Sequence, residues 1–273
     1  MAEWGGGSGH MKAYCTNLDR RPDRLQHMTG LLARHGIGFE RVAAVDGRDP
    51  QVAAAAADCR EGMSGHRMSA GAYACFQSHR EVWRRLVASG APHAMVLEDD
   101  LLIAEGFAAY LEAGWLPADA DLVKLETYQI RLHRDSGPGL AARGRRLYRL
   151  RSRHAGTGCY VIARSAAEQL LAATETISDP VDETMFNHAS PLFAGLRIYQ
   201  MVPSPVIQGE GQGEAAGQDG SGWAQSSIPD RYAPGSPARI LQAERFPARL
   251  RRRLRAEIWS VVAGTRYVVV PYG

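Results

Sequence analysis

A strand, a helix and a second strand follow one another at the start of the chain, and this pattern restricts the fold most. Residues 11–18 are predicted to form a strand, and residues 39–45 a second one. Between them Pro22 suits the first position of a helix, because its φ angle is already helical and it has no N–H to leave unpaired. A strand, helix and strand in this order predict a parallel pair joined by a right-handed crossover. The sequence therefore predicts an α/β fold.

The rest of the chain continues this alternation and indicates one domain. We expect helices over 51–59, 70–89, 105–116 and 165–173, the last capped by Ser165 with Glu168 three residues on. We expect strands over 93–97, 121–125, 159–162, 196–202 and 206–208, and an exposed hairpin or mobile insertion over 131–153. We assign residues 1–10 to a leader, 11–233 to the folded domain and 234–273 to a basic amphipathic tail.

Three consecutive carboxylates follow the apolar run 94–97: Glu98, Asp99 and Asp100. Like charges this close destabilise one another unless a positive group lies between them. Ligands of open α/β sheets bind beyond the carboxyl ends of strands, and carboxylate oxygens suit Mg²⁺ or Mn²⁺. One interpretation is a metal–diphosphate site at this strand end. The other is a solvated acidic turn that caps the following segment.

Cysteine content and charge exclude several classes of protein. Cys15, Cys59, Cys75 and Cys159 show neither Cys-x-x-Cys nor zinc spacing, which favours free thiols in a reducing cytoplasm. The net charge of +3 gives no support to nucleic-acid binding. No signal peptide is visible and no apolar run approaches the roughly 20 residues of a membrane span. We therefore expect a cytoplasmic location.

Five short blocks occur along the chain in a fixed order. They are Asn17–Arg24, Phe39–Arg48, Cys75–His79, Val96–Asp100 and Gly156–Tyr160, the last running on to Pro180–Glu183. Each block is modest alone, but the ordered set resembles glycosyltransferase family 25. That family includes bacterial lipooligosaccharide galactosyltransferases and the collagen galactosyltransferases of animals.

The resemblance implies a GT-A type fold, with a Rossmann-like, mixed and mostly parallel sheet flanked by helices. It also implies a UDP-sugar donor, Mn²⁺ or Mg²⁺, and an inverting reaction. Asp100 and Glu98 are the expected metal ligands, because a bridging metal neutralises charge on the diphosphate leaving group. The expected donor-binding residues are Thr16, Asn17, Ala44, Val45, Asp46, Ser78, Glu98, Asp99, Lys124 and Glu126.

Inversion needs a base that takes the proton of the acceptor hydroxyl. Asp182, with Glu183 beside it, is the candidate, because it follows Pro180 at a helix start where the helix dipole favours an ionised carboxylate. The alternative is that Asp182 serves only as an acid at a helix N-terminus.

The tail carries a basic cluster, Arg249–Arg255, followed by Trp259 and several valines. A basic amphipathic helix beside apolar residues suits an anionic membrane surface, where lipid-linked acceptors lie. Such binding would place the chain on the cytoplasmic face of the inner membrane. A solvated tail, an oligomer contact, or docking of the terminal valines 268–270 on the sheet are the alternatives.

We conclude from the sequence that the chain is an inverting, metal-dependent hexosyltransferase of lipooligosaccharide or other cell-surface glycan synthesis. The expected donor is UDP-galactose, with UDP-glucose as the other hexose donor, and the acceptor is an oligosaccharide or lipid-linked saccharide. Two rivals remain: a metal-dependent nucleotide-sugar hydrolase that uses the same carboxylates, and a non-catalytic protein that binds nucleotide or carbohydrate.

Overall fold

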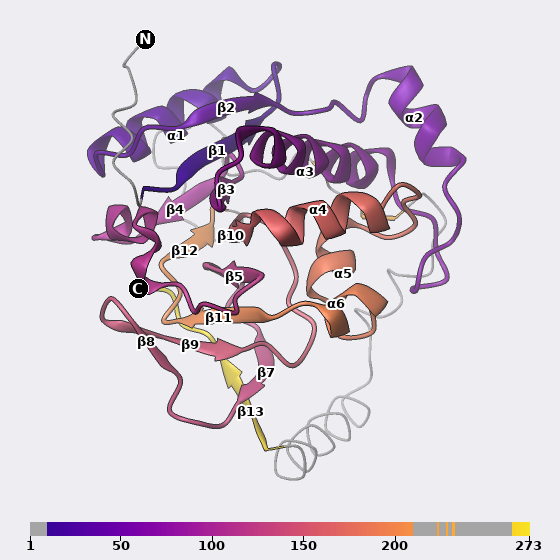
Figure 1. Ribbon diagram of the computed structural model, residues 1–273. Helices are drawn as coiled ribbons and strands as arrows, with labels where there is room; N and C mark the ends of the chain where they lie inside the picture. The colour runs from indigo at the N-terminus through magenta and orange to yellow at the C-terminus, as the bar shows by residue number, and fades with distance from the viewer. Residues whose placement is uncertain (1–9, 210–222, 224–227, 229–230, 233–263) are drawn as a thin grey trace, which may run out of the picture.

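The computed structural model of the chain describes residues 10–209, 223, 228, 231–232 and 264–273 (Figure 1). Its centre is an eight-stranded sheet. In spatial order the strands are β2 (Glu40–Ala43), β1 (Lys12–Asn17), β3 (His93–Leu97), β10 (Cys159–Ala163), β5 (Leu122–Lys124), β11 (Ile198–Val202), β9 (Arg145–Arg149) and β8 (Leu140–Ala142). Within this sheet β10 and β9 run against the other six strands. The expected α/β class with a mixed, mostly parallel sheet is confirmed.

The predicted parallel unit at the start of the chain is also confirmed. Helix α1 (Pro22–Arg34) has proline in its first turn, as the sequence indicated. Strands β1 and β2 pair in parallel, from Tyr14 opposite Glu40 to Asn17 opposite Ala43. Because parallel strands end at the same sheet edge, the residues after Asn17 and Ala43 emerge together.

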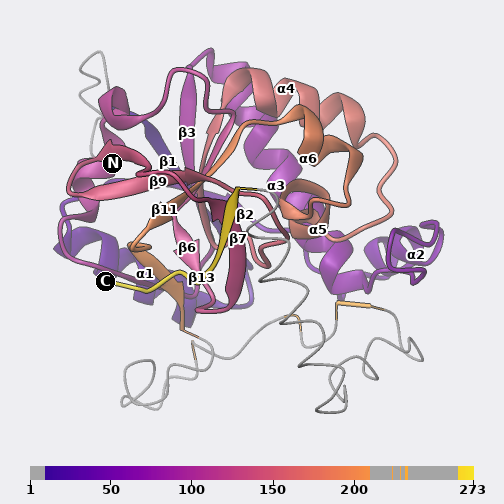
Figure 2. The same ribbon diagram turned by 90° about the horizontal axis from the view of Figure 1, so that it is seen from below.

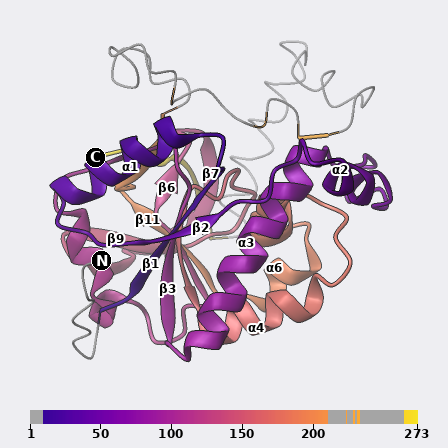
Figure 3. The same ribbon diagram turned by 90° about the horizontal axis from the view of Figure 1, so that it is seen from above.

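Helices cover both faces of the sheet. Besides α1 they are α2 (Pro50–Ala57), α3 (Ala70–Ser89), α4 (Arg164–Ala173), α5 (Val181–Phe186) and α6 (Pro191–Gly195). Figure 3 shows α1 on one side of β1 and β3, and α3 with α4 on the other. Neighbouring strand residues point to opposite faces, so Tyr14 joins the core that contains Trp83, whereas Cys15 joins the core that contains Met28. The four cysteines, all within the described residues, are free thiols.

Two small sheets extend this framework. One contains β4 (Leu101–Ile103), β12 (Val206–Gln208) and β6 (Glu126–Thr127), and the other pairs β13 (Thr265–Val269) with β7 (Arg131–Asp135). Figure 2 shows β13, in yellow, beside β7. The terminal valines 268 and 269 thus pair with β7, and Val270 is fully buried in the core that contains Trp83. Residues 233–263, with the basic cluster 249–255, lie outside the described residues.

The hairpin expected within 131–153 is present as β8 and β9, and its two turn residues, Arg143 and Gly144, have φ angles of 45° and 82°. Positive φ at both central residues is the signature of a tight hairpin turn. Among the described residues no helix is both long and apolar enough to cross a membrane.

Two local predictions are wrong. The helix expected over 105–116 is a pair of 3₁₀ helices, η1 (Phe107–Leu111) and η2 (Ala113–Trp115), because Glu112 between them is extended (ψ 125°) and Gly106 before them is left-handed (φ 76°). Ser165 does not cap α4. Strand β10 runs directly into this helix, so its last residue, Ala163, occupies the cap position, and no side chain of the described residues caps it.

His10, assigned to the leader, forms an antiparallel bridge with Glu112.

Candidate functional site

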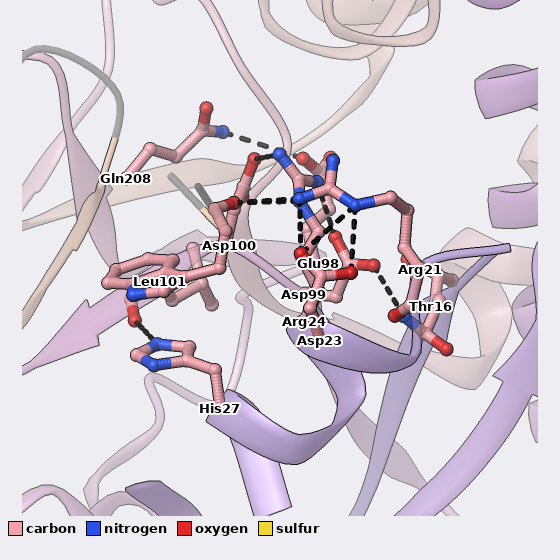
Figure 4. A network of polar contacts seen from close by, with 12 residues as sticks. Thr16, Arg21, Asp23, Arg24, His27, Glu98, Asp99, Asp100, Leu101 and Gln208 are labelled. Carbon is pink, nitrogen blue, oxygen red and sulfur yellow. Dashed lines mark hydrogen bonds and ion pairs between the residues drawn. The ribbon is translucent and has the colours of Figure 1, made fainter. Parts of the chain in front are cut away.

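The ends of β1 and β3 bring polar side chains together at one edge of the sheet (Figure 4). The side-chain amide of Asn17 donates a hydrogen bond of 2.7 Å to Asp99 Oδ2. The hydroxyl of Thr16 donates to the carbonyl of Leu97 at 3.4 Å. Both predicted donor-binding residues of the first strand therefore contact the strand end that carries the three carboxylates.

A positive group that lies between two of these carboxylates, Asp99 and Asp100, is the guanidinium of Arg24, on α1. Its Nη1 lies 2.6 Å from Asp99 Oδ1 and its Nη2 lies 3.1 Å from Asp100 Oδ2. The Arg24 side chain is 4% exposed, so little solvent screens these ion pairs. Its Nε donates to the carbonyl of Trp223 at 2.8 Å, and the Trp223 ring stacks on His27 with ring centroids 3.6 Å apart. Arg24 was not among the predicted site residues.

One carboxylate oxygen of Asp100 lacks a partner in the part of the chain that the structure describes. Its Oδ1 is buried and has no hydrogen-bond partner among the described residues. Burial raises the pKa of Asp100 to about 7, opposed by Arg24 and reinforced by the carboxylates of Glu98 and Asp99. A buried carboxylate oxygen without a partner costs free energy, and a divalent cation is one group that would satisfy it.

Glu98 is held by three donors. Its Oε1 accepts from the Thr157 hydroxyl at 2.6 Å and lies 3.2 Å from His79 Nε2, and its Oε2 lies 3.5 Å from the side-chain amide of Gln208. Burial favours the protonated form, but the contact with His79 and the hydrogen bond from Thr157 outweigh it and lower the pKa of Glu98. The Glu98 side chain is 21% exposed, so a ligand can reach it from solvent.

Lys124 and Glu126 form a pair with no exposed surface. Lys124 Nζ lies 2.7 Å from Glu126 Oε1, which also accepts from the Gly158 N–H at 2.8 Å, and Lys124 donates to the carbonyl of Gly156. Burial raises the pKa of Glu126. These two predicted donor-binding residues thus lie beneath the site and hold the Gly156–Gly158 segment.

Asp46, Ala44 and Val45 lie next to the end of β1, as predicted. The Ala44 N–H donates to the carbonyl of Asn17 and the Val45 N–H donates to the Ser78 hydroxyl, each at 2.9 Å. Asp46 accepts from Arg20 Nε at 2.6 Å. Ser78 therefore acts through the backbone of Val45 and does not pair with the neighbouring His79.

The candidate base lies at the first turn of α5. Asp182 Oδ2 accepts from the Gly156 N–H at 2.8 Å and forms an ion pair with Arg231. Burial opposes ionisation of Asp182, yet Arg231 and the Gly156 N–H keep its pKa below the usual value. Glu183 accepts from Arg153 Nε at 2.7 Å. Nothing in the sequence signalled Arg231, because 49 positions separate it from Asp182.

The segment Gly156–Gly158 connects the two halves of the site. Its three residues contact three carboxylates in turn: Gly156 contacts Asp182, Thr157 contacts Glu98, and Gly158 contacts Glu126. The strand-end cluster and the candidate base are therefore parts of one network.

The charge balance of the strand-end cluster favours a cation. Glu98, Asp99, Asp100 and Glu126 are neighbours, and among the described residues Arg24 and Lys124 form ion pairs with members of this group. Either protonation or a divalent cation can offset the remaining negative charge. The all-oxygen donor set of Asp100 and Glu98 suits Mg²⁺ or Mn²⁺.

The sequence is similar to those of known proteins. The sequence model of the family described as glycosyltransferase family 25 (LPS biosynthesis protein) matches residues 10–185. Over 213 residues, the chain is 32% identical to the lacto-N-neotetraose biosynthesis glycosyltransferase LgtB of Neisseria meningitidis serogroup B, covering 72% of this chain and 75% of that protein. It is 28% identical over 156 residues to the lipooligosaccharide biosynthesis protein lic2B of Haemophilus influenzae, and these residues cover 54% of this chain and 56% of that protein.

A human relative is named inactive glycosyltransferase 25 family member 3. It is 28% identical over 181 residues, which cover 60% of this chain and 29% of that protein. The family match includes every candidate site residue from Thr16 to Glu183, whereas Gln208 and Arg231 lie beyond it.

Proposed function

The chain belongs to glycosyltransferase family 25, and from this membership we propose that it moves galactose from UDP-galactose to a saccharide hydroxyl with inversion. The relatives named for lacto-N-neotetraose and lipooligosaccharide biosynthesis support an oligosaccharide or lipid-linked acceptor of the cell surface. The observation that carries the proposal is the carboxylate cluster at the end of β3, with one buried Asp100 oxygen that lacks a partner among the described residues.

The residues of this cluster fit a divalent metal. Asp100 through its unpartnered Oδ1, and Glu98 through its partly exposed side chain, would hold Mn²⁺ or Mg²⁺. A bound divalent cation would neutralise charge on the diphosphate leaving group. We propose that Thr16, Asn17 and the Ala44–Asp46 segment enclose the nucleoside, since they lie at the same sheet edge.

Asp182 is the proposed general base. Both of its described hydrogen-bonding contacts fall on Oδ2, so Oδ1 is the atom that would accept the proton of the acceptor hydroxyl. As that proton leaves, the acceptor oxygen forms a bond to the anomeric carbon while the bond from this carbon to the UDP oxygen breaks. The ion pair with Arg231 favours the ionised form of Asp182, which is the form that can accept a proton. Glu183 lies beside it and accepts a hydrogen bond from Arg153.

We also propose a peripheral position on the cytoplasmic face of the inner membrane. Arg131, Arg143 and Arg146 are exposed on or beside β7 and β9, and the basic cluster 249–255 precedes β13, which pairs with β7. Positive charge near a membrane surface contributes about 1 kcal/mol per Lys or Arg with anionic lipid.

The test is a panel of UDP-sugars with saccharide acceptors in Mn²⁺, with EDTA controls, scored by UDP release and by mass spectrometry of the product. A glycosidic product from UDP-galactose supports the proposal. Free sugar released at the same rate without acceptor would identify a hydrolase. Tight UDP binding without turnover would identify a binding protein.

A further inference from the structure

A chain of buried polar side chains leads from the core of the molecule to Glu98. The indole Nε1 of Trp83 lies 2.9 Å from the hydroxyl oxygen of Tyr160, and that hydroxyl lies 2.9 Å from His79 Nδ1. On the other side of the ring, His79 Nε2 lies 3.2 Å from Glu98 Oε1. Trp83, Tyr160 and His79 are each at most 1% exposed, whereas Glu98 is accessible.

The direction of these hydrogen bonds follows from the chemistry of the groups. An indole N–H can only donate, so the Tyr160 oxygen must accept from Trp83. The Tyr160 hydroxyl proton has no acceptor other than His79 Nδ1 among the described residues. A buried hydroxyl left without an acceptor is costly, so Nδ1 accepts this proton. The remaining ring proton then lies on Nε2, where it faces the carboxylate of Glu98.

We propose that His79 is a positioning residue, fixed as the Nε2–H tautomer by Tyr160 and Trp83, that orients the Glu98 carboxylate toward the nucleotide-sugar donor and its metal. This inference rests on the proposed function, because it requires that Glu98 face the nucleotide-sugar donor and its metal in that reaction. Thr157 donates to the same oxygen of Glu98, so two donors from different elements, α3 and the segment before β10, restrict the carboxylate.

The same side chains include a possible ligand set for a softer metal. Cys75 Sγ, a nitrogen of His79 and an oxygen of Glu98 all lie within 4.8 Å of one another. A metal on Nε2 would move the ring proton to Nδ1, and the Tyr160 oxygen would then accept two hydrogen bonds while its own proton lost its acceptor. The buried relay therefore favours a hydrogen bond to Glu98 over metal ligation by His79.

The tautomer is measured directly by long-range ¹H–¹⁵N correlation spectra of the imidazole side chains in the full chain, with His79→Gln used to assign the His79 signals. We expect protonated Nε2 and unprotonated Nδ1 at His79, and loss of this preference in Tyr160→Phe. Protonated Nδ1 in the wild-type protein, or zinc bound at this histidine after purification, would overturn the proposal. This measurement needs no turnover, so it stands even if the proposed reaction fails.

Kinetics then separate positioning from packing. His79→Leu removes the donor to Glu98, and loss of such outer-shell partners typically lowers activity by about 10–100-fold. We expect a decrease of this size in kcat/KM for the UDP-sugar, with most of it recovered in His79→Gln, whose side-chain amide can donate from a similar position. His93→Leu is the matched control, because it removes a half-buried imidazole from the opposite end of β3.

His79→Leu with wild-type kcat/KM would refute the proposal while leaving the proposed function intact. Equal losses in His79→Gln and His79→Leu, at equal thermal stability, would also refute it, since packing would then explain both. Absence of turnover in the wild-type protein would instead refute the proposed function.

Discussion

Asp100→Asn tests the metal site and the electrostatics around it together. In the wild-type protein burial raises the pKa of Asp100 to about 7 from an ordinary value near 3.8. Below the ordinary value both the folded and unfolded forms are protonated, and the shift has no effect. Between the two values the folded protein binds the proton more tightly than the unfolded chain, so stability falls as pH rises. Above pH 7 the folded protein carries the full free-energy cost of an ionised, buried Asp100.

The size of the effect follows from the shift. Each pKa unit corresponds to about 1.36 kcal/mol, so ionising Asp100 costs up to about 4 kcal/mol in the folded state at pH 8. Asparagine carries no charge, but its amide would face the position of the unpartnered Oδ1, and an unsatisfied buried donor costs about 1–3 kcal/mol. We therefore expect Asp100→Asn to be more stable than the wild-type protein at pH 8 by about 1–3 kcal/mol in EDTA.

The assay is denaturant unfolding of both proteins at intervals from pH 4 to pH 8, with and without Mn²⁺. The advantage of Asp100→Asn should grow with pH up to about 7 and then level off. Mn²⁺ should stabilise the wild-type protein and not the variant, and turnover should be lost in the variant with weaker UDP binding in Mn²⁺. A stability difference that does not change with pH would refute the electrostatic reasoning. Wild-type turnover in Asp100→Asn, or full wild-type activity in EDTA, would refute the metal site.

Three further predictions concern other parts of the molecule. Asp182→Asn should lower kcat by about 10²–10⁴-fold with nearly normal UDP-sugar binding. If Glu183→Gln shows that loss instead, Glu183 is the base. If neither variant loses activity, the start of α5 is structural. Lys124→Met should lower the free energy of unfolding by about 3–5 kcal/mol, because it leaves Glu126 buried without its cation. Adding Glu126→Gln should recover part of this loss. An unchanged denaturant midpoint in Lys124→Met would contradict the pairing. Replacing the arginines of cluster 249–255 by glutamine should weaken binding to anionic vesicles while activity on a soluble acceptor survives. Substitution is preferable to truncation, because truncation would remove β13. Vesicle binding that salt does not weaken would count against the proposal.

Local patterns were sufficient to predict most of the framework. The apolar runs at β1 and β3, and Pro22 at the start of α1, depend on neighbours in the sequence, and the structure confirms each of them. The contact of Asn17 with Asp99 was not predicted; it arises because β1 and β3 are parallel neighbours that end at one edge of the sheet. The 3₁₀ helices after Gly106 were missed because apolar spacing alone does not distinguish them from an α-helix.

Partners distant in the sequence could not be predicted in the same way. The requirement for a positive group among the three carboxylates was clear, but that it is Arg24, 75 positions before Asp99, depends on how α1 packs over the strand ends. Arg231 reaches Asp182 from beyond the region that the family model matches. Which residues pair across such distances is decided by topology, and no local pattern encodes it.

Gly156 and Gly158 explain how the two halves of the site keep a fixed geometry. Gly156 has φ of 82°, and a Cβ there would collide with the Tyr128 ring; a Cβ at Gly158 would lie 2.5 Å from Glu126 Oε2. Gly156 therefore requires glycine, whereas a side chain at position 158 would displace the ends of the Glu126 and Gln208 side chains. Because this short segment contacts both Asp182 and Glu98, a shift of its backbone would move the proposed base and the proposed donor-side carboxylate together. In an inverting transfer the attacking and leaving oxygens lie on opposite sides of one carbon, so a single rigid segment that holds the residues for both sides suits the proposed reaction.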